Sequence, residues 1–193
     1  MKPNFALAQD TATRLLLKQT IDGFYIDVRK LQLRDDIIID TVQHYSAVTA
    51  TPLSELRCPG LEGAFTIRKY GKNIILYDDA VSNEQRKHWG IVHEVGHIYL
   101  GHTNDDRIEE IEAHFFAAQL LAPEIVLIEL AKLNHRISAA YIHNYFNLSF
   151  ESAQKRIETL RNRGCWNCSD IDKKLLEKYM PLIERSKSDL FAM

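Results

Sequence analysis

The chain has 193 residues, of which 46% are hydrophobic and 26% charged, and its formal net charge at pH 7 is -2. This size and composition are typical of a globular protein with one sizeable core, and the near-balanced charge argues against a general nucleic-acid binder or a membrane-surface protein. No stretch approaches the roughly 20 apolar residues that span a bilayer, and no signal peptide is evident. An odd number of cysteines cannot all pair within one chain. We therefore expect a cytoplasmic protein with reduced thiols and no membrane contact.

The first part of the chain combines helical and strand patterns. Alternation at period two predicts strands, and Gly71-Lys72 between two such stretches predicts a hairpin turn. The expected elements are a helix at 7–20 that ends at Asp22-Gly23, a short helix at 27–33, and strands at 37–42, 63–68 and 73–77.

The rest of the chain has helical patterns only. Ser82, with Gln85 three residues later, has the spacing of a capping box and predicts the start of a helix that ends at Gly101. Further helices are expected at 106–121, from Pro123 to about 133, in two pieces within 137–163 around Asn147, and at 171–186. The chain is therefore predicted to be an α+β protein, mostly helical with one small sheet.

The strongest chemical signal is the sequence His93-Glu94-Val95-Gly96-His97, an H-E-x-x-H motif inside a predicted helix. Residues four apart share a helical face, so both imidazoles can bind one zinc ion. Glu94 would then act as general base for a water molecule and carry the proton to the leaving amine. Chance produces this motif in roughly one chain in fifty of this length. The apolar setting, and a preceding strand at 73–77 that is expected to form a substrate-binding sheet edge, favour a metal site over a surface helix with two histidines.

A catalytic zinc usually has a third protein ligand, and residues 109–114 supply several candidates. Glu110 and His114 are four apart and share one face of the next helix. Ala113 and Ala117 lie on a neighbouring part of that helix, where small side chains would allow a close approach to the first helix. Without the upstream motif, a solvated acidic face would be the better interpretation of this cluster.

The segments 93–102 (HEVGHIYLGH) and 110–123 (EIEAHFFAAQLLAP) together resemble the ImmA/IrrE family of bacterial and phage metallopeptidases. The resemblance implies a zincin-like core and a gluzincin-like site in which Glu110 is the third zinc ligand. His114 stands where the family usually has Asn or Asp, a residue expected to hydrogen-bond near a zinc-binding histidine. His114 is therefore either such a partner or a competing ligand.

The resemblance also implies a partner. Members of this family typically cleave or otherwise inactivate a helix-turn-helix repressor of a mobile element or a stress response. The alternative is a zinc-binding regulator that acts by protein contact without proteolysis. A second oxyanion donor is usual in such a peptidase, and four candidates remain open: Tyr70, Tyr77, His88 and His102.

The last part of the chain, residues 136–193, is expected to form a helical extension that follows a metallopeptidase domain at 1–135. Residues 137–160 have the rhythm of a helix-turn-helix, with four basic side chains near the second helix: Lys155, Arg156, Arg161 and Arg163. Because acidic residues dilute this charge, we expect the helices to pack on the core and direct nucleic-acid binding to be absent. Cys165 and Cys168 form one C-x-x-C pair, which is more typical of reduced structural thiols than of a zinc knuckle.

Overall fold

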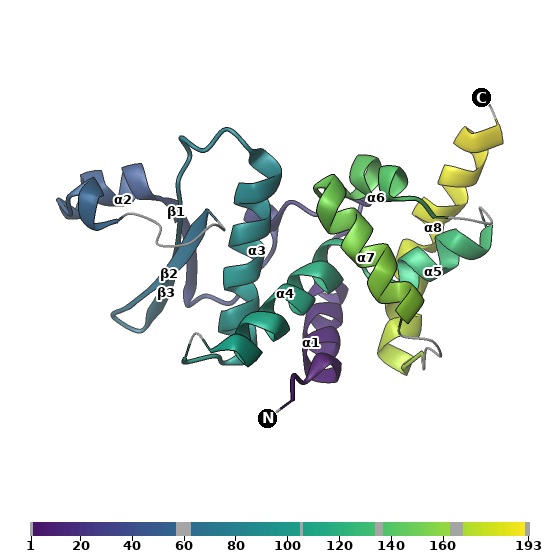
Figure 1. Cartoon of the computed structure of the whole chain (residues 1–193), viewed down its shortest axis with the longest axis horizontal. Helices are drawn as coiled ribbons and strands as arrows, with labels where there is room; N and C mark the ends of the chain where they lie inside the picture. Colours follow the sequence, from purple (N-terminus) through teal and green to yellow (C-terminus); the bar gives the residue numbers. More distant parts are fainter. Residues whose placement is uncertain (1, 57–62, 105, 134–136, 163–167, 192–193) are drawn as a thin grey trace. The chain divides into compact units, whose positions relative to one another are not determined.

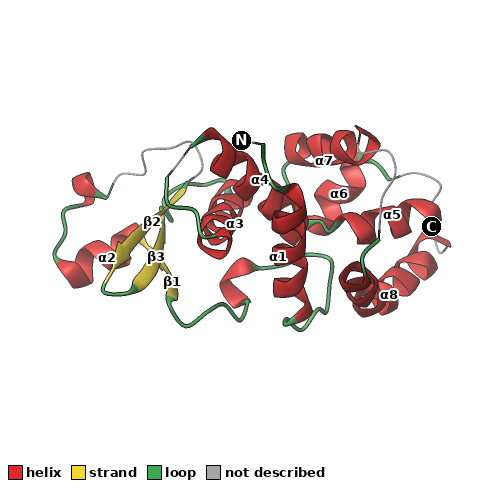
Figure 2. Ribbon diagram, turned by 90° about the horizontal axis from the view of Figure 1, so that it is seen from below, coloured by secondary structure: helices red, strands yellow, loops and turns green. Residues whose placement is uncertain are grey.

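The computed structural model describes residues 2–56, 63–104, 106–133, 137–162 and 168–191 (Figure 1). The helices are α1 Phe5–Leu17, α2 Val42–Thr49, α3 Glu84–Leu100, α4 Arg107–Leu121, α5 Glu124–Leu133, α6 Ala139–Phe146, α7 Phe150–Asn162 and α8 Asp170–Phe191. The strands are β1 Ile37–Thr41, β2 Ala64–Lys69 and β3 Lys72–Tyr77, and 3₁₀ turns lie at Val28–Lys30 and Leu53–Glu55. Helix dominates and the sheet is small (Figure 2), so the predicted α+β class is confirmed.

The three strands form one sheet in the order β1-β3-β2, with β1 parallel and β2 antiparallel to β3. The expectation that the strand before the motif helix would form a sheet edge is wrong. Strand β3 is central because β1, from far upstream, hydrogen-bonds to the side that the hairpin with β2 leaves open. Within the described residues, the edge strand on the hairpin side is β2.

The two faces of the sheet pack against different helices. Phe65 lies opposite Leu76 in the register, and both belong to an apolar cluster with Val42 and Tyr45 of α2. Side chains alternate between faces along a strand, so the neighbouring pair, Thr66 and Ile75, points to the opposite face. That face meets α3, which packs against both β2 and β3.

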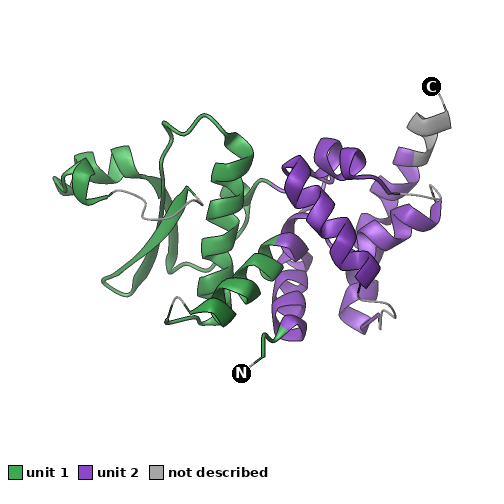
Figure 3. Ribbon diagram, in the orientation of Figure 1, with its two compact units in different colours: residues 1–4, 27–117 green, residues 5–26, 118–193 purple. Residues whose placement is uncertain are grey.

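The chain divides into two compact units, drawn in different colours in Figure 3. The first comprises residues 1–4 and 27–117 and contains the sheet, α2, α3 and most of α4. The second comprises residues 5–26 and 118–193. These units do not follow the boundary expected at residue 135, since α1 and α5 both pack against α8. The division into a metallopeptidase domain at 1–135 and a helical extension at 136–193 stays a prediction.

The second unit is entirely helical in its described residues. Phe24, which follows α1, contacts Phe146 and Tyr179 with ring centroids 5.2 and 6.3 Å apart. Helices α6 and α7 pack against each other, and Asn147 between them adopts the left-handed conformation that ends α6. The predicted helix-turn-helix-like pair is therefore present.

The basic residues of that pair are engaged in different ways. Arg156 is buried and donates two hydrogen bonds, from Nε and Nη2, to the carbonyl oxygen of Ala122. Lys155 is exposed and pairs with Glu151 at 2.7 Å. Arg156 is thus a packing residue. Arg163 and Cys165 lie outside the described residues, and Cys168 is an exposed free thiol.

Three local predictions need correction. Asn83, not Ser82, caps α3. The Asn83 side chain accepts a hydrogen bond from the amide of Arg86, so the capping interaction lies one residue further along the chain than expected. The short helix expected at 27–33 is only a 3₁₀ turn. Helix α2 was not expected, although Thr41 caps it by accepting from the amide of His44.

No single helix among the described residues is long and apolar enough to cross a membrane. Helices α4 and α5 meet that test only as a pair bent by 47°.

Candidate metal centre

The H-E-x-x-H motif lies in the second half of α3. His93 and His97 are one helical turn apart and are 3% and 6% exposed. The helix ends at Gly101, whose φ of 74° permits the left-handed turn, with hydrogen bonds from Gly101 N to Ile98 O and from His102 N to His97 O. The two histidines of the motif are therefore buried, and backbone hydrogen bonds close the end of the helix that carries them.

Helix α4 approaches α3 at Gly96, inside the motif. A Cβ atom at Gly96 would lie 2.9 Å from Phe116 Cδ1 and 3.3 Å from the carbonyl oxygen of Ala113. Distances below 3.0 Å are not tolerated without movement, so only glycine allows this spacing. Gly96 thus sets how close the side chains of α4 come to the two histidines.

The carboxylate of Glu110 reaches both histidines. Its Oε2 lies 3.3 Å from His93 Nε2, its Oε1 lies 3.2 Å from His97 Nε2, and the two Nε2 atoms are 2.9 Å apart. A tetrahedral zinc with ligand bonds of about 2.0–2.1 Å separates neighbouring ligand atoms by about 3.3 Å. The two nitrogen–oxygen distances match this spacing and the nitrogen–nitrogen distance is about 0.4 Å shorter, so the set needs only a small adjustment to hold such an ion. The Glu110 side chain is 39% exposed, so the centre is accessible from the Glu110 side.

The His114 ring also lies beside His93. The two rings are 4.5 Å apart, and the Trp89 ring is 6.1 Å from that of His114. His93, Glu110 and His114 could also hold a metal ion, since their ligand atoms lie within 4.8 Å of one another. The spacing of the set with His97 is closer to that of a tetrahedral site, and we therefore favour it over the set with His114.

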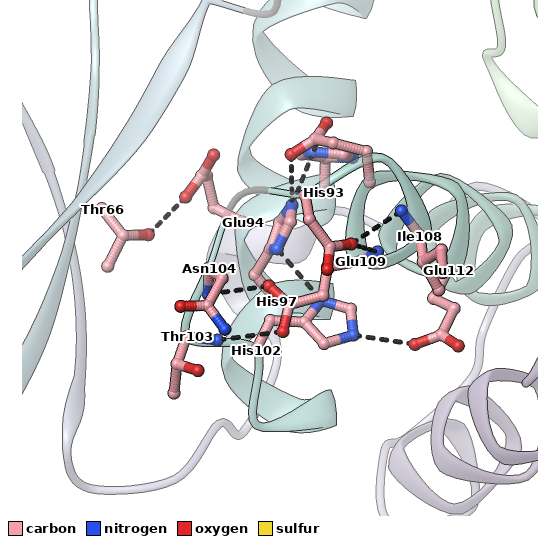
Figure 4. A network of polar contacts seen from close by, with 12 residues as sticks. Thr66, His93, Glu94, His97, His102, Thr103, Asn104, Ile108, Glu109 and Glu112 are labelled. Atoms are coloured by element: carbon pink, nitrogen blue, oxygen red, sulfur yellow. Dashed lines mark hydrogen bonds and ion pairs between the residues drawn. The ribbon is translucent and has the colours of Figure 1, made fainter. Parts of the chain in front are cut away.

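The other two glutamates of the cluster make different contacts (Figure 4). Glu109 accepts hydrogen bonds from the amides of Thr103 and Asn104 and so closes the loop between α3 and α4. Glu112 binds His102 Nε2 at 3.0 Å. Since each carboxylate has its own partners, Glu110 is the member of the cluster that faces the histidine pair.

Asp106 begins the helix that carries Glu110. Its Oδ1 accepts hydrogen bonds from the amides of Ile108 and Glu109 at 2.8 and 2.9 Å, which is N-cap geometry. These bonds from Glu109 and then Ile108 lower the pKa of the Asp106 carboxyl below its usual value.

The Glu94 side chain points towards the sheet (Figure 4). Thr66 Oγ1 on β2 donates a hydrogen bond to Glu94 Oε2 at 2.5 Å. Thr66 could not be identified from the sequence, because only the strand register places its side chain on the face that meets α3.

The four candidate oxyanion donors have distinct environments. Tyr70 is 90% exposed in the hairpin, and buried His88 accepts a hydrogen bond from the amide of Val28 through Nε2. His102 is buried beside His97. Tyr77 lies opposite Ala64, on the same sheet face as Thr66. His88 and His102 thus have structural partners, and Tyr70 projects into solvent.

Comparison with known proteins identifies one family. The model of the Peptidase_M78 family, described as the IrrE N-terminal-like domain, matches residues 58–158, which is more than half of the chain. No curated protein and no solved structure matches the chain significantly.

Proposed function

Since the chain belongs to the Peptidase_M78 family of IrrE N-terminal-like domains, we propose that it is a zinc-dependent regulatory peptidase. The observation that carries this proposal is the convergence of His93 Nε2, His97 Nε2 and the Glu110 carboxylate within 3.3 Å of one another. This donor set is the one that peptidase zinc sites use, with a position left for water or substrate.

Each residue of the centre has a role in the proposed reaction. His93, His97 and Glu110 would hold zinc, which when bound would supply a Lewis acid for a peptide carbonyl. Glu94 would accept a proton from the attacking water and deliver it to the leaving amine. Thr66 holds the Glu94 carboxylate in position through the hydrogen bond from its hydroxyl.

The sheet offers a place for the substrate. Among the described residues, β2 has one unpaired side, and an extended peptide can add to such an edge through backbone hydrogen bonds. Thr66 lies on β2 and contacts Glu94, so a peptide paired with this strand would lie beside the proposed base.

We further propose that the substrate is a helix-turn-helix repressor of a mobile element or stress response, encountered in the cytoplasm. This part rests on the resemblance of the two motif segments to the ImmA/IrrE proteins. Burial of Arg156 and the pairing of Lys155 with Glu151 support a protein rather than a nucleic-acid partner, since both reduce the charge available for phosphates.

The rival function is a zinc-binding regulator that acts by contact alone. Glu94 favours catalysis, because a structural zinc site has no use for a carboxylate held next to the ligands. The accessibility of the centre on the Glu110 side favours it as well, since structural zinc sites are closed by four protein ligands.

The decisive experiment compares wild type with Glu94→Gln in cells that naturally contain the protein. Zinc content is measured on both purified proteins, and new protein N-termini are mapped by mass spectrometry. We expect about one zinc per chain in both, and a new N-terminus in a helix-turn-helix protein only with wild type. Zinc in both proteins with no new N-terminus would favour the contact regulator, and absence of zinc would refute both.

A further inference from the structure

His102 contacts His97 twice, although five residues separate them. On a continuous helix, residues five apart point about 140° away from each other. The left-handed turn at Gly101 reverses the chain instead, so that His102 N donates to His97 O at 3.0 Å. The same turn brings the two Nδ1 atoms to 3.0 Å.

With a metal at His97 Nε2, the contacts allow one assignment of protons along the side chains of His97, His102 and Glu112. His97 Nε2 faces Glu110 and His93, so its lone pair is directed to the proposed metal and its proton is on Nδ1. His97 Nδ1–H therefore donates to His102 Nδ1. The proton of His102 is then on Nε2, which donates to Glu112 Oε2 at 3.0 Å.

Glu112 and His102 are each anchored by a further hydrogen bond. The other oxygen of Glu112, Oε1, accepts a hydrogen bond from the amide of Asn4 at 2.5 Å. Arg68 Nη2 donates to the carbonyl oxygen of His102 at 2.5 Å and so fixes its backbone to β2. The side chains of His102 and Glu112 are 6% and 12% exposed, which limits competition from water.

We propose that His102 and Glu112 are positioning residues for the metal: they fix the Nδ1–H tautomer of His97, orient its ring and strengthen Nε2 as a ligand. A histidine that binds a metal is commonly oriented by an acceptor on its other nitrogen, and removal of such a partner costs about 10- to 100-fold in metal affinity. Here the acceptor is a second histidine, whose own tautomer is set by a carboxylate. The inference rests on the proposed function in that it requires metal binding at His97.

The first test measures zinc affinity by competition with a chromophoric chelator on the full chain. We expect His102→Leu to bind zinc about 10- to 100-fold more weakly than wild type, and Glu112→Gln to bind it about 10-fold more weakly. Glu109→Gln is the matched control, because it removes one negative charge from the same helix, whereas the described hydrogen bonds of the Glu109 carboxylate come from the amides of Thr103 and Asn104. Its zinc affinity should equal that of wild type.

The second test needs no variant. Two-bond ¹H–¹⁵N NMR spectra of the zinc-loaded wild type report which nitrogen of each histidine carries the proton. We expect His97 protonated on Nδ1 and His102 on Nε2.

Three results would overturn the inference: His102 protonated on Nδ1, unchanged zinc affinity in His102→Leu, or equal loss in Glu109→Gln and Glu112→Gln. The last would mean that any nearby charge acts equally. Failure of the wild type to bind zinc would instead refute the proposed function itself, so the two failures are distinguishable.

Discussion

Thr66 Oγ1 donates a hydrogen bond of 2.5 Å to Glu94 Oε2 and so joins the edge strand β2 to the motif helix α3. This distance falls within the range of hydrogen bonds to an ionised oxygen, about 2.5–2.7 Å. The bond holds the proposed base through a residue of the strand along which a peptide would lie. Substrate binding and orientation of the base are therefore connected through one side chain.

Replacement of Thr66 by valine should slow cleavage without loss of zinc. Valine keeps the β-branched shape but has no hydroxyl, and a hydrogen bond to a charged group contributes about 1.5–3 kcal/mol, so we expect the cleavage rate to fall about 10- to 100-fold. The measurement is the cleavage rate of the target identified by N-terminus mapping, with zinc content determined in parallel. Thr66→Ser should retain most activity, and a Thr66→Val protein as fast as wild type would refute the role.

The contact at Gly96 predicts a coupled stability effect. In Gly96→Ala the new methyl group would lie 2.9 Å from the Phe116 ring and force α3 and α4 apart, at a cost of about 1–3 kcal/mol in the free energy of unfolding. Phe116→Leu removes the ring atom that clashes. In a double-mutant cycle followed by urea unfolding, the second change should therefore cost less in the Gly96→Ala background than in wild type. Strictly additive effects would show that the two residues do not limit the approach of the helices.

The choice between Glu110 and His114 as third ligand leads to opposite effects on zinc. Glu110→Gln replaces an anionic oxygen that lies 3.2–3.3 Å from both histidines, and we expect most bound zinc to be lost. His114→Asn should retain about one zinc per chain, because Glu110 still completes the site with His93 and His97. Metal analysis after dialysis decides the question, and the reverse pattern would make His114 the ligand.

The histidine pair could be predicted from the sequence because its geometry is local. Residues four apart on one helix share a face whatever the rest of the chain does, and the end of α3 at Gly101 follows an equally local rule. The small sheet also follows from local alternation and a glycine turn. Helix α2 was missed because Thr41, its cap, continues the strand pattern of β1 without a break.

The partners of these residues depend on tertiary contacts, which no local rule supplies. Periodicity places Glu110 and His114 on one face, but the rotation of α4 against α3 determines which glutamate meets the histidines. That rotation depends on packing at Gly96 and Phe116. The contact of Thr66 with Glu94 needs the strand register, and the central place of β3 needs its pairing with β1. One feature of the sequence pointed to the position of His102: Gly101, directly before it, predicts the turn that ends α3.

Substitutions of Arg156 and of its neighbour Lys155 test whether α7 has a packing role or a DNA-binding role. Arg156→Met leaves the Ala122 carbonyl without its two donors, so we expect a loss of about 1–3 kcal/mol in the free energy of unfolding. Lys155→Met removes an exposed side chain and should change stability by less than about 0.5 kcal/mol. Thermal unfolding measures both. Salt-sensitive duplex binding by wild type, weakened in Lys155→Met, would instead support a DNA-binding helix.

The cap of α4 predicts how the stability of the helix that carries Glu110 depends on pH. Hydrogen bonds from the amides of Glu109 and Ile108 lower the pKa of Asp106 from its ordinary value of 3.8. A lowered pKa in the folded state means that the stabilisation is complete above pH 3.8 and is lost as the pH falls through the lower, folded value.

Asn caps helices about as well as Asp but does not titrate, so Asp106→Asn is the matched control. The melting temperatures of the metal-free proteins should differ by a constant amount from pH 7 to about 4, and wild type should lose stability relative to Asp106→Asn below that. Chelation of metal beforehand keeps zinc release from the histidines out of the comparison. A difference that stays constant at still lower pH would show that the Asp106 carboxylate does not cap α4.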